Sequence, residues 1–134
     1  MSQIWVSQTQ TILYGNADTN KAWKVLLHRS PIQVRRGLVS VGGRKVKRDD
    51  LAVFFIRPQV AIYGGMVAAV APTGMVGARL SIRQPLFSAG AGYPDWLILA
   101  PEMLKDGLKG IPGAGFFGND WEVSWKNSAW RLGR

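Results

Sequence analysis

The alternation of hydrophobic and polar positions predicts short strands and helices joined by turns rich in glycine and proline. Residues 51–56 and 65–71 are almost continuously apolar, which is typical of strands buried on both faces, as in a parallel sheet covered by helices. Residues 32–35 and 38–41 alternate apolar and polar positions around a tight turn and predict a hairpin, which leads into the basic segment 44–47. The predicted strands are residues 11–14, 32–35, 38–41, 51–56, 65–71, 96–100 and 113–117, and the predicted helices are residues 20–27, 75–84 and 102–105.

The order of these elements predicts an α/β fold with three layers and a mainly parallel central sheet, of the flavodoxin-like or half-Rossmann-like kind, with a small basic hairpin. The chain has 134 residues, which is enough for one hydrophobic core. We expect an N-terminal extension at residues 1–10, a single α/β domain at residues 11–122, and a tail at residues 123–134 that contains tryptophan but shows no clear period.

The composition excludes several classes of site. The chain has no cysteine and a single histidine, His28, so disulfides, thiolate metal sites and cysteine nucleophiles are excluded, and we expect no metal and no cofactor. The longest apolar runs are interrupted by proline or paired glycines, so we expect no transmembrane helix. The first residues lack the basic and apolar regions of a secretory signal. Because a chain without cysteine suits either redox environment, the compartment stays undetermined.

The residues needed for nucleophilic catalysis are not evident. The nucleophile-elbow pattern GxSxG is absent, and His28 follows a predicted helix, where a cation is favoured without any catalytic role. Residues 113–118 match GxGxxG, but too little chain follows for the helix, second strand and acidic residue of a dinucleotide site. We therefore expect no enzymatic activity from this chain alone.

Small and polar residues at the ends of predicted strands are candidates for binding a small ligand, because open α/β sheets bind ligands where strands lead into helices. Ordinary turns and helix caps require the same residue types, so both interpretations stay open. The candidate ligand-binding residues are Asn16, Asp18, Thr73, Gly74, Asp95 and Asp120.

The excess of positive charge is concentrated in one part of the chain. The net charge is +9, and residues 21–57 hold ten of the lysines and arginines but only two acids, Asp49 and Asp50. Such a cluster is typical of a surface that contacts phosphates, although a solvated hairpin has the same composition and no aromatic RNA-binding motif or GXXG clamp accompanies it. The candidate polyanion-binding residues are Arg35, Arg36, Arg44, Lys45, Lys47 and Arg48.

A set of short motifs occurs in order along residues 11–122. They are YGNADTNKAW at 14–23, RG at 36–37, DDLAVFFIRP at 49–58, TG at 73–74 with Gly77, GYPD at 92–95 and GFFGNDW at 115–121. In this order they resemble the C-terminal α/β module of secreted bacterial proteins of the prolyl oligopeptidase-like α/β-hydrolase family. One departure is that residues 59–65 are apolar where that family is expected to have a polar loop.

The resemblance implies a non-catalytic role for this chain, because the family's nucleophile elbow and its acid and base partners lie upstream of the module. The first hypothesis is therefore an accessory or interaction domain of a peptidase-like or esterase-like hydrolase, with a hydrolase domain or a second copy of the chain as partner. The alternative is a basic module that binds nucleic acid or another polyanion. A small-ligand site around Asn16 and Thr73 is a third possibility.

Overall fold

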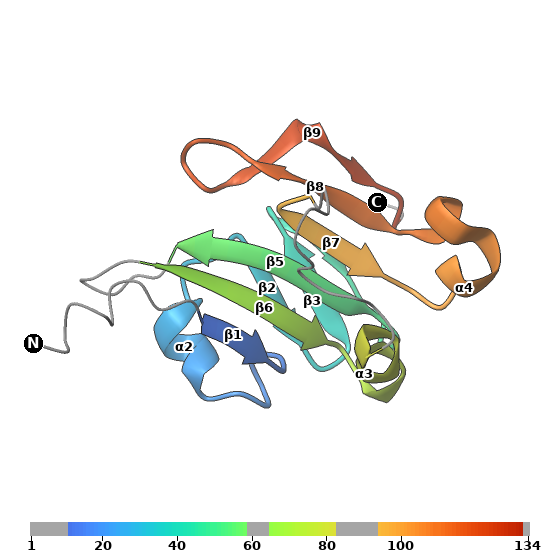
Figure 1. Ribbon diagram of the computed structural model, residues 1–134, viewed down its shortest axis with the longest axis horizontal. Helices are drawn as coiled ribbons and strands as arrows, with labels where there is room; N and C mark the ends of the chain where they lie inside the picture. The colour runs from blue at the N-terminus through green and yellow to red at the C-terminus, as the bar shows by residue number, and fades with distance from the viewer. Residues whose placement is uncertain (1–10, 59–64, 83–93, 133–134) are drawn as a thin grey trace, which may run out of the picture.

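The computed structural model describes residues 11–58, 65–82 and 94–132 (Figure 1). The predicted extension 1–10, the apolar connection 59–64 and most of the glycine-rich stretch before residue 94 lie outside the described residues. The elements in chain order are β1 (Thr11–Tyr14), α2 (Ala22–Leu26), β2 (Ile32–Arg35), β3 (Leu38–Val41), β4 (Arg44–Val46), β5 (Ala52–Pro58), β6 (Met66–Pro72), α3 (Met75–Ile82), β7 (Trp96–Leu99), α4 (Met103–Asp106), the 3-10 turn η1 (Gly107–Gly110), β8 (Gly113–Phe117) and β9 (Val123–Trp130).

The strands form two sheets, and the prediction of a mainly parallel three-layer α/β fold is wrong. The described chain is 44% strand and 19% helix. The large sheet has the strand order β1-β6-β5-β7-β8-β9, and the small sheet has the order β2-β3-β4. Within the large sheet β1 and β6 are parallel, whereas every other neighbouring pair is antiparallel, so the sheet is mixed.

The continuous apolar runs reflect burial on both faces of the large sheet and carry no information on strand direction. Val53 and Phe55 of β5 belong to a core cluster shared with the small sheet. The alternate residues Ala52 and Phe54 belong to a second cluster, on the other face, with Leu80 of α3. An antiparallel strand covered on both faces therefore has the same composition as a buried parallel strand, which is why the pattern was misinterpreted.

The small sheet covers one face of the large sheet. Ile32, Val34, Val39 and Val41 are fully buried in the cluster that contains Val53 and Phe55. Figure 1 shows β2 and β3 lying behind β5 and β6. The helix α2 joins this layer, since the Trp23 ring makes an edge contact with Phe55 at 5.8 Å between ring centroids. The predicted strand pair is present, and β4 adds a third strand to it.

Residues 123–130, for which the sequence predicted no element, form the edge strand β9. It pairs antiparallel with β8. Trp125 contacts the buried Trp96 at 6.1 Å and Trp130 at 5.8 Å between ring centroids, both edge-on. The strand is thus held by contacts to residues distant in sequence. Among the described residues no helix is long and apolar enough to cross a membrane.

Candidate functional site

One layer of the molecule is built from a stretch of chain that contains no acid. Residues 19–48 hold nine lysines and arginines and no aspartate or glutamate. This stretch forms α2 and the whole small sheet, and we refer to it as the basic layer. Its cations are Lys21, Lys24, Arg29, Arg35, Arg36, Arg44, Lys45, Lys47 and Arg48.

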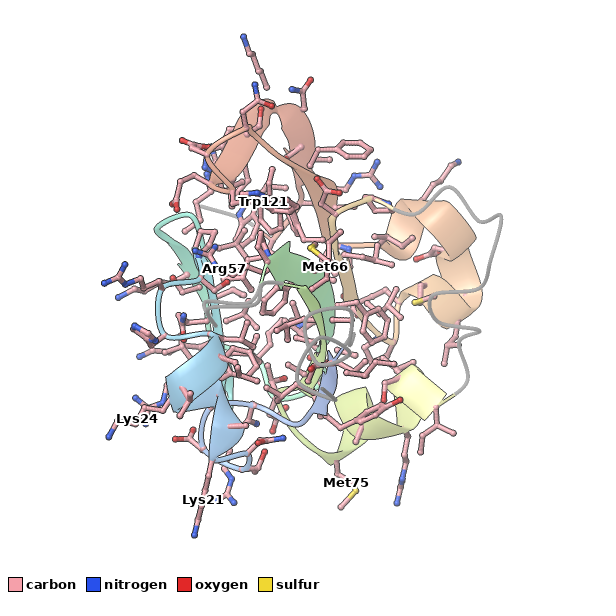
Figure 2. The ribbon with its side chains drawn as sticks, turned by 60° about the vertical axis from the view of Figure 1, so that its left-hand side comes forward. Lys21, Lys24, Arg57, Met66, Met75 and Trp121 are labelled. Carbon is pink, nitrogen blue, oxygen red and sulfur yellow. The ribbon has the colours of Figure 1, made fainter. Side chains whose placement is uncertain are left out.

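The packing of the small sheet determines where these cations lie. Alternate residues of β2 and β3 are buried against the large sheet, so the residues between them face the other way. Gln33, Ser40 and Lys45 are cross-strand neighbours on that outer side. Lys21 and Lys24 project from α2 away from the rest of the molecule (Figure 2). The layer therefore presents its charge to solvent.

Arg35 is engaged in an ion pair with Asp18. Its Nη2 lies 2.7 Å from Asp18 Oδ1, and the backbone N–H of Arg36 donates to Asp18 Oδ2 at 3.0 Å. The hydrogen bond from Arg35 and then that from the Arg36 backbone lower the pKa of Asp18 below its ordinary value. This carboxylate is therefore ionised at neutral pH and offsets one of the layer's positive charges.

Arg48 bridges two carboxylates from different parts of the chain. Its guanidinium donates to Asp50 at 2.8 Å and 2.9 Å, and to Glu102 at 2.8 Å and 3.0 Å. The hydrogen bond from Arg48 is the main cause that lowers the pKa of both acids, and the two acids raise the pKa of Arg48. These contacts connect the segment after β4 to the start of α4.

Arg44 stacks on an aromatic ring. Its guanidinium carbon lies 3.8 Å from the centroid of the Trp125 ring, within the range of a cation–π contact. Three of the six candidate polyanion-binding residues are thus used within the protein. The other three, Arg36, Lys45 and Lys47, are exposed and make no ion pair in the described part of the chain.

The candidate list from the sequence omitted Lys21, Lys24 and Arg29, which belong to the same layer. All three are exposed and, within the described ranges, free of ion pairs. The sequence signal that could have identified them is that residues 19–48 contain no acid. This acid-free stretch delimits the basic segment more clearly than the overall excess of positive charge does.

Three of the six candidate ligand-binding residues lie together. Asn16, Thr73 and Gly74 line a hollow of about 400 Å³, to which Arg36 and Asp49 also contribute. Asp18 is adjacent, since its backbone N–H donates to Asn16 Oδ1 at 2.9 Å. The ends of β1 and β6, which pair in parallel, therefore lie at the same hollow.

The buried polar groups around the hollow are already used to hold the chain. Asn16 Nδ2 donates to the Pro72 carbonyl at 2.9 Å, and the backbone N–H of Leu51 donates to Thr73 Oγ1 at 3.0 Å. These bonds tie together the turn after β1, the end of β6 and the start of β5. They account for Asn16 and Thr73 as structural residues without a ligand.

Asp95 and Asp120 lie elsewhere. Asp95 Oδ2 accepts from the backbone N–H of Phe117 at 2.9 Å, and Asp120 Oδ1 accepts from that of Glu122 at 3.1 Å. Neither residue lines the hollow. The GxGxxG match falls on β8 and its exit, and β8 is paired on both sides, so it is not a phosphate-binding loop. The described residues contain no group of three side chains able to hold a metal ion.

Comparisons with protein-family models, with curated proteins and with solved structures found no match for this chain.

Proposed function

We propose that this chain is a binding module whose basic layer binds a polyanion, with nucleic acid as the main candidate. The observation that carries the proposal is that the acid-free stretch 19–48 forms one continuous layer of the fold. When a positively charged surface binds a polyanion, it releases the counterions that surround the polyanion. This release favours binding whatever the sequence of the nucleic acid.

The free cations of the layer rest on a rigid support. The inner side chains of the small sheet are fully buried, and Trp23 of α2 is 2% exposed. The strands and the helix are thus held in place before any partner binds, so little backbone entropy is lost on association. The ion pairs of Arg35 and Arg48 hold the edges of the same layer.

Salt titration of binding to heparin and to DNA oligonucleotides tests this proposal. If several phosphates are contacted, affinity for the oligonucleotides falls by orders of magnitude between about 50 and 200 mM salt. The double variant Lys45→Glu/Lys47→Glu is expected to weaken binding at least tenfold at 0.1 M salt. The matched control is Arg79→Glu/Lys105→Glu, which changes the net charge equally on α3 and α4, outside the basic layer.

The proposal is wrong if none of these polyanions binds, if binding does not depend on salt, or if the control pair weakens it as much as the test pair. Thermal unfolding of both variants shows whether each remains folded, so that a loss of affinity is assigned to charge.

The role of an accessory domain for a hydrolase is a second proposal, favoured by apolar side chains at one edge of the large sheet. Leu13 of β1 is buried, while Ile12 is 50% and Tyr14 is 65% exposed on the other face of that strand. Labelling of the isolated chain by a serine-directed fluorophosphonate, or turnover of ester or prolyl-peptide substrates, would contradict a non-catalytic role. Co-purification with a hydrolase that is lost in an Ile12→Ser/Tyr14→Ser variant would support it.

A further inference from the structure

We infer that the partner of the basic layer is double-stranded nucleic acid, held through its phosphates without base stacking or base-specific contacts. This inference rests on the proposed function and adds the class of polyanion. We base the inference on the kinds of side chain that the layer exposes, because single strands are bound through rings on which bases stack, whereas duplexes are bound mainly through their phosphates.

The basic layer has no exposed tryptophan, tyrosine or phenylalanine on which a base could stack. Trp23 is the one tryptophan, tyrosine or phenylalanine in the stretch 19–48, and it is 2% exposed. Its Nε1 donates to Gln33 Oε1 at 2.8 Å, and its ring packs on Phe55. The exposed His28 offers only a single small imidazole ring. Proteins that bind single strands gain about 1–3 kcal/mol for each base stacked on an aromatic ring, and no exposed tryptophan, tyrosine or phenylalanine of the layer supplies this contribution.

Arginine planes are the other groups on which unpaired bases stack, and three of those in the layer are already occupied. Arg35 is paired with Asp18, Arg48 is held by two carboxylates, and Arg44 lies on the Trp125 ring. The free cations are mainly lysines, namely Lys21, Lys24, Lys45 and Lys47, with Arg29 and Arg36. Lysine ammonium groups contact phosphates as point charges and lack the planar fork of arginine.

The distribution of these charges matches a duplex better than a single strand. The free cations are spread over a helix and a three-stranded sheet and so belong to a broad surface. Duplex DNA carries one charge for about every 1.7 Å of its axis, twice the density of one strand, and so offers more phosphates to a broad surface.

Fluorescence anisotropy with two unrelated 16-base-pair DNA duplexes, their separated strands, and heparin at equal charge tests the inference. At 0.1 M salt we expect the duplexes to bind at least tenfold more tightly than either the single strands or heparin. The two duplexes should bind equally within about twofold. The double variants Lys21→Glu/Lys24→Glu and Lys45→Glu/Lys47→Glu should each weaken duplex binding at least tenfold.

Two controls separate this surface from the rest of the molecule. Phe116 of β8 is 49% exposed and lies outside the basic layer, so Phe116→Ala should leave duplex affinity unchanged, as should Arg79→Glu/Lys105→Glu. Equal or tighter binding of single strands, preference for heparin, strong discrimination between the two duplexes, or loss of binding in Phe116→Ala would overturn the inference and leave polyanion binding intact. Absence of binding to every probe would overturn both.

Discussion

The guanidinium of Arg44 lies over the indole of Trp125, with 3.8 Å between the guanidinium carbon and the ring centroid, and it joins the small sheet to the last strand of the large one. The backbone of Gly42 also lies close to this indole, since a Cβ added at that position would be only 3.1 Å from Trp125 Nε1. The turn between β3 and β4 thus approaches β9 closely, and the two sheets are linked near the edge of the fold.

Replacing Arg44 should destabilise the protein modestly. Arg44→Ala removes the contact with Trp125 and is expected to lower the free energy of unfolding by about 0.5–1 kcal/mol, as for other exposed cation–π contacts. The control is Lys45→Ala, an exposed neighbour without such a contact. Urea unfolding measures both, and equal effects of the two variants would show that the stacking contributes nothing.

The bridge made by Arg48 should make stability depend on pH. Because Arg48 lowers the pKa of Asp50 and of Glu102 in the folded state, both acids bind protons less readily when folded than when unfolded. Their contribution is present above the ordinary carboxyl range, from about pH 5 upward, and is lost as pH falls through the lowered pKa values.

Arg48→Met should therefore be less stable than the unaltered chain by about 1–2 kcal/mol at pH 7, since a bidentate network contributes more than an isolated surface pair. The difference should shrink as pH falls from about 5 towards 2. Unfolding measured across this range, with Lys47→Met as control, tests the bridge. A difference that does not change with pH would contradict it.

Neutralising Asp18 should strengthen binding of duplex DNA. Asp18→Asn removes the charge that is paired with Arg35 and returns that guanidinium to the basic layer. One additional phosphate contact corresponds to a gain of up to about eightfold at 0.1 M salt. Asp120→Asn changes the net charge equally at an exposed position in the turn between β8 and β9, outside the basic layer. If both variants strengthen binding to the same extent, net charge alone is responsible and the basic layer is not the binding surface.

Gly77 of α3 should not tolerate a side chain. Alanine normally favours a helix over glycine, but a Cβ at this position would overlap the backbone carbonyl of Leu51. Gly77→Ala is therefore expected to destabilise the chain by about 1–3 kcal/mol, as overpacked positions do. Arg79→Ala, at an exposed position of the same helix, serves as the reference in thermal unfolding. A stabilised Gly77→Ala variant would show that α3 can move away from the start of β5.

The positions of most strands and helices could be read from the sequence because they depend on local patterns. The alternation in residues 32–35 and 38–41 placed β2 and β3 within their observed bounds. Strand β9 could not be predicted in this way, because Trp125 contacts Trp96 of another strand, and no regular period in residues 123–130 records that contact.

The candidate site was predictable in part. The sequence placed Asn16 and Thr73 at the ends of strands, and the parallel pairing of β1 with β6, which the structure shows, brings them to one hollow. The contacts made by Arg35, Arg44 and Arg48 could not be predicted, because each of these residues is engaged by a residue distant along the chain. The composition of the sequence does not record such partners.

The sequence by itself determined which segments are buried on both faces and that the positive charge is gathered in one acid-free stretch. The tertiary structure alone decided that the large sheet is mixed, that β9 completes it, and which cations remain free. The physical reason is that hydrophobicity and charge are properties of each residue. Strand direction and ion pairing instead depend on contacts between residues that the folded chain brings together from separate parts of the sequence, such as Arg48 and Glu102.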